Sequence, residues 1–310
     1  MKTPEDESHE AKAPLSRTAR ARARAAALQA RAHRVGEQAE AERGRHESVD
    51  AVFEMVDRDR EVGGGIMAGA LAYRFFIWLL PFALVAVGGL GLTSQAASES
   101  PEEAAKSLGL AGLVSSSVES AANSPAHWYA LLIGLPVLVW VTRSLLRALI
   151  VVHRLVWTDL RASAPRPTVG ATLLLLALLV GAFAVSAVAS AARAWSESGG
   201  AVVTAGVFFV NLGFWLFIST RLPHRDAPWR FLLPGAAVFA VGIEVIQLLT
   251  AYLIAPQASS KQGTYGALGL AAALLLGLYF LMRLVVTAAV VNATLWERRV
   301  RSRRPREQSP

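Results

Sequence analysis

The stretch YGALGLAAALLLGLYFLMRLVVTAAVVNATLW, residues 265–296, decides the fold class of this chain. It is apolar for nearly its whole length, and as an α-helix it would be about 48 Å long, whereas the hydrocarbon core of a bilayer is about 30 Å thick. The stretch also contains Arg283 well inside it. A charged side chain near mid-membrane costs about 2.5–3.5 kcal/mol on insertion scales, so it normally faces protein or water. The stretch therefore predicts a membrane-spanning helix inside a bundle.

Five more apolar runs lie upstream, in a chain of 310 residues that is 54% hydrophobic. Segments of about ten residues with alternating polarity, which a membrane β-barrel needs, are absent. We therefore predict an all-α membrane protein with six transmembrane helices. The predicted spans cover residues 66–92, 128–152, 168–192, 201–220, 231–254 and 265–296.

Two amphipathic helices are expected on the surface of this bundle. In residues 48–59 the valines and Phe53 follow the spacing of one apolar helix face, and Arg58 lies with three acidic residues on the opposite face. The connection 93–127 contains a Ser-Pro-Glu-Glu helix start followed by apolar residues at helical spacing.

Charged tails flank the predicted membrane domain. Residues 1–47 mix basic and acidic side chains, and we interpret them as a tail that is disordered or partly helical. Residues 48–297 form the six-span domain, and residues 298–310 form a basic tail. Arginines concentrate after spans two, four and six, whereas the connections after spans one, three and five are poor in basic residues. Because basic residues mark the cytoplasmic side, both termini are predicted to be cytoplasmic.

The composition limits the chemistry that the chain can perform. It has no cysteine, so disulfides and thiolate sites are excluded. Its six histidines are scattered without metal-binding spacing, and it has no nucleotide-binding motif. We expect no cofactor, no metal and no enzymatic activity. The net charge of +8 lies mostly in tails and alternate loops, so membrane lipids, and not nucleic acid, are the expected partners.

Polar side chains inside the spans are the candidate functional site. Glu244 and Arg283 each lie about 13 residues from the cytoplasmic end of their spans, or roughly 20 Å of helix rise, so a buried ion pair is expected. Gln247 follows Glu244 by one turn. The candidate residues are Arg74, Glu244, Gln247, Tyr279, Arg283 and Thr287.

Two interpretations of this cluster stay open. The ion pair can simply lock the bundle, since buried charges in membranes usually pair whatever their function. Alternatively, the cluster lines a polar cavity whose guanidinium groups bind the phosphate or carboxylate of an anionic amphiphile that the protein moves through the bilayer. Arg143 and Arg147 of span two are interpreted as arginines that snorkel to the interface. A structural or scaffold protein of the cell envelope is the second function class, and a ribonuclease is the third.

Three stretches carry a resemblance to a known family. They are GIMAGALAYRFFIWLLP (65–81), LPHRDAPWRFLLPGAAVFAVGIEVIQLLTAYL (222–253) and GTYGALGLAAALLLGLYFLMRLVVTAAVVNATL (263–295). Together with the six-span layout, they resemble the YihY/virulence factor BrkB family of bacterial inner-membrane proteins, over about residues 48–297. Family members were once labelled ribonuclease BN, a label regarded as mistaken. The resemblance implies the fold and an inner-membrane location, and it implies no defined activity.

Overall fold

The computed structural model describes Ala26, Arg31 and residues 47–97, 127–158, 167–195, 200–249 and 255–303. The chain divides into two compact units, Met1–Glu54 and Met55–Pro310. The helix bundle described below belongs to the second unit. The predicted N-terminal tail lies almost entirely outside the described residues, as does most of the predicted surface helix in 93–127. The predicted C-terminal tail is described as far as Arg303, where α10 ends.

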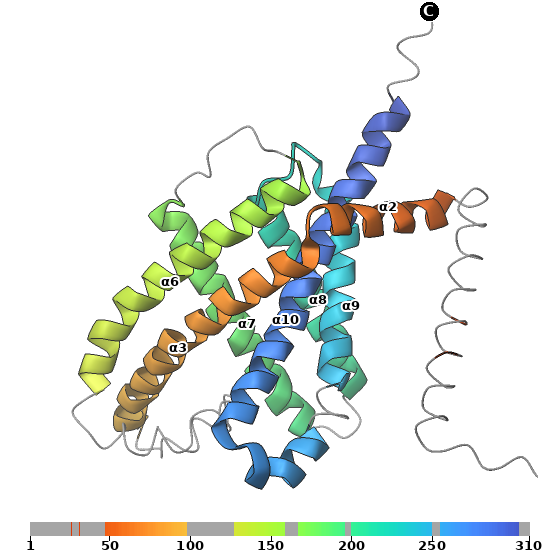
Figure 1. The fold of residues 1–310 in the computed structure, drawn as a ribbon. Coiled ribbons are helices and arrows are strands. Elements are labelled where there is room, and N and C mark those ends of the chain that lie inside the picture. Colours follow the sequence, from red (N-terminus) through yellow and green to blue (C-terminus); the bar gives the residue numbers. More distant parts are fainter. Residues whose placement is uncertain are drawn as a thin grey trace, which may run out of the picture. The chain divides into compact units, whose positions relative to one another are not determined.

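The described segments are helical apart from short turns (Figure 1), and no strand occurs in them. Six of the helices are long and apolar enough to cross a membrane, which confirms the predicted fold class. The helices are α2 (Glu47–Glu61), α3 (Gly64–Ala97), α6 (His127–Val156), α7 (Val169–Trp195), α8 (Gly200–Arg221), α9 (Leu233–Leu249) and α10 (Ala255–Arg303), with the 3-10 turn η1 (Trp229–Phe231) before α9.

The helix α10 starts earlier than the sequence predicts. A polar turn is expected over residues 255–264, but α10 already begins at Ala255, so that expectation is wrong. The segment contains two Ala, two Gln, two Ser and one Lys, which are acceptable in a helix. Its one proline, Pro256, lies in the first turn, where a missing N–H costs no hydrogen bond. Polarity alone therefore did not end the helix.

The helix α2 forms as predicted, but its faces differ from the amphipathic pattern. Val52 is 58% exposed, whereas Arg58 is only 9% exposed. The assignment of Arg58 to the solvated face is therefore wrong, and the ion pair described below explains its burial.

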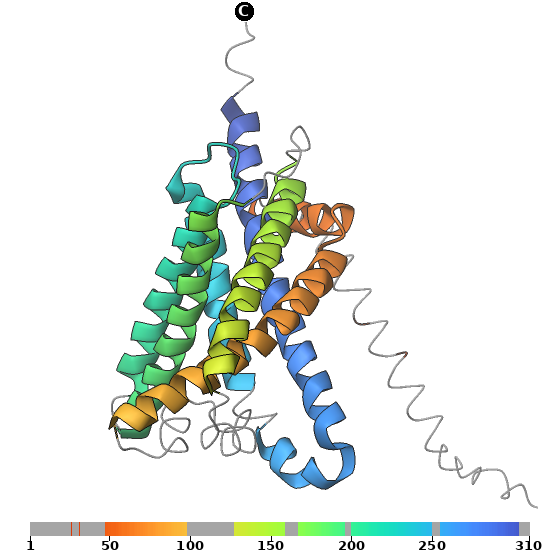
Figure 2. The ribbon, with the colours of Figure 1, turned by 90° about the vertical axis from the view of Figure 1, so that its left-hand side faces the viewer.

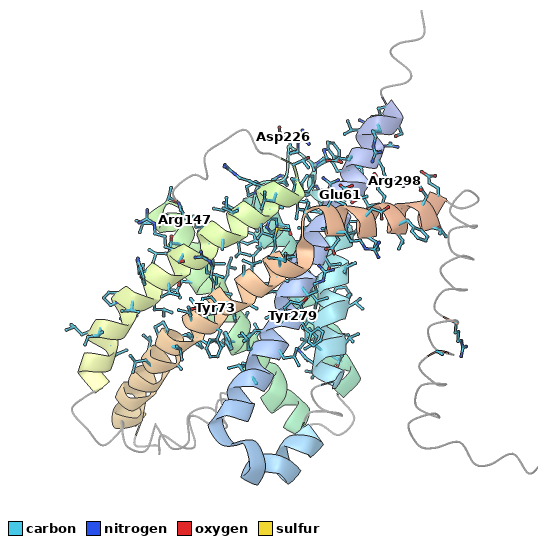
Figure 3. All side chains as sticks on the ribbon, viewed as in Figure 1. Glu61, Tyr73, Arg147, Asp226, Tyr279 and Arg298 are labelled. Carbon is cyan, nitrogen blue, oxygen red and sulfur yellow. The ribbon has the colours of Figure 1, made fainter. Side chains whose placement is uncertain are left out.

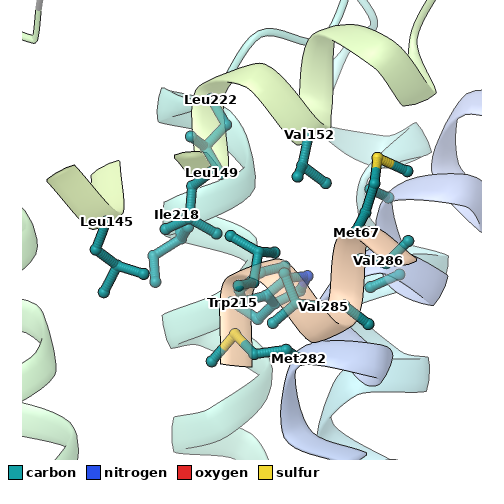
Figure 4. Close-up of a cluster of buried hydrophobic side chains, with 14 of the residues drawn as sticks. Met67, Leu145, Leu149, Val152, Trp215, Ile218, Leu222, Met282, Val285 and Val286 are labelled. Carbon is teal, nitrogen blue, oxygen red and sulfur yellow. The ribbon is translucent and has the colours of Figure 1, made fainter. Parts of the chain in front are cut away.

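Helix contacts in the second unit are centred on α3 and α10. α3 packs against both α6 and α10, and α9 packs against both α8 and α10. α7 contacts α6 and α8, and Figure 2 shows these three helices side by side. Buried apolar side chains from α3, α6, α8 and α10 meet in one core, which includes Met67, Leu149, Trp215 and Met282 (Figure 4).

Aromatic side chains add specific contacts to this core. Trp78 of α3 is fully buried, stacks on Phe82 with ring centroids 4.8 Å apart, and donates from Nε1 to Thr142 Oγ1 of α6 at 2.8 Å. Trp215 of α8 stacks on Phe239 of α9 at 4.4 Å. These contacts fix α3 on α6 and α8 on α9.

The start of α9 is held on α10 by a close contact at Gly235. The backbone N–H of Gly235 donates to Asn292 Oδ1 at 2.8 Å, and Asn292 is buried. This N–H belongs to the first turn of α9, where no carbonyl of the same helix can accept it. A Cβ at Gly235 would lie 2.6 Å from the Asn292 amide and would overlap the Ala288 carbonyl oxygen. Glycine is therefore needed here for the two helices to approach.

Candidate functional site

Arg58 joins three helices at one end of the bundle, which we call the polar end. This end consists of the last turn of α2, the end of α6 at Val156, the loop 222–228 and the turn of α10 around Glu297. Arg58 Nη1 donates to Glu297 Oε2 at 2.7 Å, and Nη2 donates to Oε1 at 2.8 Å. Its Nε and Nη2 also donate to the Val156 carbonyl oxygen at 3.0 and 2.8 Å. One guanidinium thus binds α6 and α10 together.

The contact with Val156 has a clear electrostatic basis. Val156 is the last residue of α6, so its carbonyl oxygen has no N–H partner in its own helix and lies at the negative end of the helix dipole. A buried cation there satisfies the carbonyl and, at the same time, neutralises the Glu297 carboxylate. Arg58 therefore belongs to the framework of the polar end.

The turns around this network contain unusual backbone conformations. Thr158, Arg225 and Asp226 have φ values of 51°, 46° and 56°, in the left-handed region that non-glycine residues rarely adopt. Arg225 Nη1 lies 3.3 Å from both the Trp157 carbonyl oxygen and Thr158 Oγ1, and 3.7 Å from Glu297 Oε1. The strained turns thus bring a second arginine to the carboxylate that Arg58 binds.

A second ion pair joins α2 to α10. Arg283 donates from Nη1 to Asp59 Oδ1 at 2.7 Å and from Nη2 to Asp59 Oδ2 at 2.6 Å. The pair lies directly over Gly64 at the start of α3, because a Cβ built on Gly64 would be 2.7 Å from Arg283 Nη1 and would overlap the Asp59 carboxylate. Glycine at this position leaves the space that the ion pair occupies.

The expected pairing of Arg283 with Glu244 is therefore wrong. Nη1 and Nη2 of Arg283 both donate to the carboxylate of Asp59, the residue after Arg58 in α2. Glu244 is half-buried in α9, and its Oε1 is buried without a hydrogen-bond partner. Asp59 is distant from Arg283 in the sequence but close to it in space. Its carboxylate accepts both hydrogen bonds of the guanidinium, so Glu244 is not the partner.

The other candidate residues lie at separate places. Tyr279 is half-buried beside the α2–α3 junction, where its hydroxyl would be 3.6 Å from a Cβ on Gly65. Gln247 and Thr287 are half-buried in α9 and α10. Among the described residues, no hydrogen bond or ion pair links Arg74, Glu244 and Arg283 to one another. The joint polar cavity thus stays a prediction.

Arg74 lies one helical turn from the buried Leu71 and Trp78 on α3, and its side chain is exposed. Its Nη1 donates to the Ser144 hydroxyl of α6 and lies 3.5 Å from the Ser144 carbonyl oxygen. Both partners are neutral. Arg147, labelled on α6 in Figure 3, is also exposed. Arg143 is half-buried, and its Nε is buried without an acceptor.

No group of three or more His, Asp or Glu side chains that could hold a metal ion occurs in the described part of the chain.

The chain matches the family model described as Virulence factor BrkB over residues 56–310. It belongs to the BrkB virulence factor family. This match covers most of the chain, includes all six candidate spans, and starts two residues before Arg58. A search of the curated proteins found no match, and neither did a search of the solved structures.

Sequence reasoning missed two partners in this BrkB family member. Asp59 was given no role beyond the last residue of the predicted helix 48–59, and Glu297 none beyond the last residue of the membrane domain. The triple glycine 63–65 directly after α2 was a usable signal, since glycine at a helix junction permits close approach of other groups. The identity of the approaching group could not be derived from it.

Proposed function

We propose that this BrkB family chain is a multi-pass protein of the bacterial inner membrane that moves an anionic lipid, or another anionic amphiphile, across or within the bilayer. The family membership and the six apolar helices support the membrane location. Arg74 is the single observation that carries the proposed activity.

Arg74 is a cation inside a span without a carboxylate partner. It follows the start of α3 at Gly64 by about ten residues, which is about 15 Å of helix rise. It is exposed, and among the described residues its hydrogen bonds go only to Ser144. By contrast, Arg58 and Arg283 each have a carboxylate. Because an unpaired guanidinium at membrane depth is costly, a membrane protein that retains one is expected to use it on an anion.

Replacing Arg74 with glutamine is expected to slow the transfer of an anionic lipid between leaflets by about tenfold or more, since a hydrogen bond to a charged group contributes about 1.5–3 kcal/mol. The measurement uses the full chain in liposomes with a fluorescent anionic lipid, and an otherwise identical zwitterionic lipid in parallel. Arg60→Gln, at an exposed arginine of α2, is the matched control. Equal transfer rates for wild type and Arg74→Gln would sink the proposal.

A non-transporting structural protein of the envelope is the second candidate. The observation that favours it is that Arg58 and Arg283 are held in bidentate ion pairs, as in a rigid framework. The same liposome experiment separates the two, because a scaffold transfers no anionic lipid even as wild type.

The proposed orientation puts both termini in the cytoplasm. A reporter that is active only outside the cytosol is expected to be active when fused after Gly200, at the start of α8, and inactive when fused after Arg304. Activity of the C-terminal fusion would reverse the proposed orientation.

A further inference from the structure

We propose that α3 and α6 together form a binding site for the phosphate-bearing headgroup of a bilayer lipid, entered sideways from the membrane. The site consists of Arg74, Arg143, Ser144 and Arg147, which we call the basic face. The proposal rests on the proposed function and deepens it, since it names where the amphiphile binds and from which phase it arrives.

Helix geometry places the three α6 residues of the basic face together. Residues three and four apart are neighbours on a helix surface, so Arg147 lies beside both Ser144 and Arg143. At 100° per residue, the three positions fall within an arc of about 100°. Ser144 receives the Arg74 side chain from α3. The Arg74 guanidinium is therefore bound at Ser144, and Arg147 lies one turn further along the same face of α6.

The charges of the basic face are uncompensated within the described residues. No ion pair is formed by Arg74, Arg143 or Arg147 there, whereas the arginines of the polar end pair with Glu297. The buried Nε of Arg143 has no acceptor either. Two guanidinium groups on this arc of α6, together with that of Arg74 from α3, match the several acceptor oxygens of a phosphate, which arginine binds in a bidentate way.

The side chains around the basic face indicate a ligand that also has acyl chains. Tyr73 on α3 is 60% exposed, and Trp140 on α6 is 72% exposed. Val151, two turns from Ser144 on the same side of α6, is also exposed. In a membrane this apolar surface faces lipid, so an anion that reaches the arginines from the bilayer can keep its chains against these residues. A ligand that arrives from the aqueous phase would not have acyl chains in contact with this apolar surface.

Snorkelling to the membrane interface explains the positions of Arg147 and Arg143 less well than a lipid-binding site does. They precede the end of α6 at Val156 by about 9 and 13 residues, or roughly 14 and 20 Å of rise. Snorkelling is typical of arginines near helix ends. It also leaves unexplained why Arg143 has its Nε buried in the protein. A headgroup phosphate at this depth would give the exposed guanidinium groups of Arg74 and Arg147 an anionic acceptor.

The test is lipid binding by the full chain in detergent, measured by native mass spectrometry with phosphatidylglycerol and with phosphatidylcholine. Wild type is expected to prefer phosphatidylglycerol. The Arg74→Gln/Arg147→Gln double variant is expected to bind it about 100-fold more weakly, which is about tenfold, or 1.4 kcal/mol, for each arginine. Binding of phosphatidylcholine is expected to stay unchanged.

Controls separate recognition from general charge and from loss of fold. Arg60→Gln/Arg299→Gln removes two exposed arginines elsewhere and should leave the preference intact. Arg74→Lys/Arg147→Lys keeps the charge but loses the planar fork, so it should bind phosphatidylglycerol more weakly than wild type. The unfolding temperature of each variant in the same detergent verifies that the domain is folded.

Two results would overturn the proposal: no preference for phosphatidylglycerol in the wild type, or an unchanged preference in the folded double glutamine variant. Displacement of the lipid by millimolar inorganic phosphate would overturn the claim that the ligand of this site is a lipid that enters from the bilayer. Selective binding without lipid transfer in liposomes would refute the proposed function and leave this site standing. Lipid transfer without selective binding of phosphatidylglycerol would refute this site and leave the proposed function standing.

Discussion

Replacing Arg58 with alanine is expected to destabilise the folded membrane domain by about 3 kcal/mol, at the lower end of the cost of removing one partner from a buried ion pair. The reason is the number of groups that depend on this side chain. Without it, the Glu297 carboxylate and the Val156 carbonyl oxygen both lose their donors. The lower end applies because the Glu297 side chain is 29% exposed, so water and Arg225 can compensate part of the loss.

The measurement is the unfolding of the purified full chain in detergent, by denaturant or by heat. Arg60→Ala is the matched control, because Arg60 lies in the same helix and is exposed, and its replacement should change the stability by less than about 0.5 kcal/mol. Arg58→Lys should fall between wild type and alanine, since lysine keeps the charge without the bidentate geometry. Equal stabilities of Arg58→Ala and Arg60→Ala would contradict the role assigned to the polar end.

Replacing Asp59 with asparagine is expected to cost about 2 kcal/mol, because it leaves Arg283 inside the bundle without its carboxylate. The figure is reduced from that for a fully buried pair, as one third of the Arg283 side chain is exposed. Adding Arg283→Gln removes the unpaired cation, so the double variant should be more stable than Asp59→Asn alone. A double-mutant cycle should give a coupling energy of about 2 kcal/mol.

Asp226→Asn is the control for the loss of one negative charge at an exposed position, and asparagine tolerates the left-handed backbone there. A coupling energy near zero between Asp59 and Arg283 would mean that the ion pair does not hold α2 on α10. If Arg283→Gln/Asp59→Asn is folded and still transfers lipid, Arg283 is a framework residue and does not bind substrate.

The six spans could be predicted because the signal is local. A run of apolar residues long enough to cross a bilayer can be recognised from its own sequence, without knowledge of what it packs against. The predicted run 168–192, for example, corresponds closely to α7 at Val169–Trp195. The start of α10 was missed because its first residues are polar, and polarity does not by itself end a helix.

The charge pairing could not be predicted because it is non-local. Arg58 finds its acceptors 98 and 239 positions away along the chain, and Asp59 lies 224 positions from Arg283. Depth within a span ranked Glu244 as the partner of Arg283, but depth says nothing about which side of a helix faces which neighbour. The Arg74–Ser144 contact is also non-local. Serine is uncharged, so its position in a span gave no signal that it would bind an arginine.

The most direct test of the central claim is an electron cryo-microscopy map of the full chain in nanodiscs that contain phosphatidylglycerol. We expect headgroup density between Arg74 and Arg147, within hydrogen-bond distance of Ser144, with acyl-chain density running past Tyr73 and Trp140. Acyl-chain density alone along this surface, with both guanidinium groups turned to the aqueous phase, would contradict it.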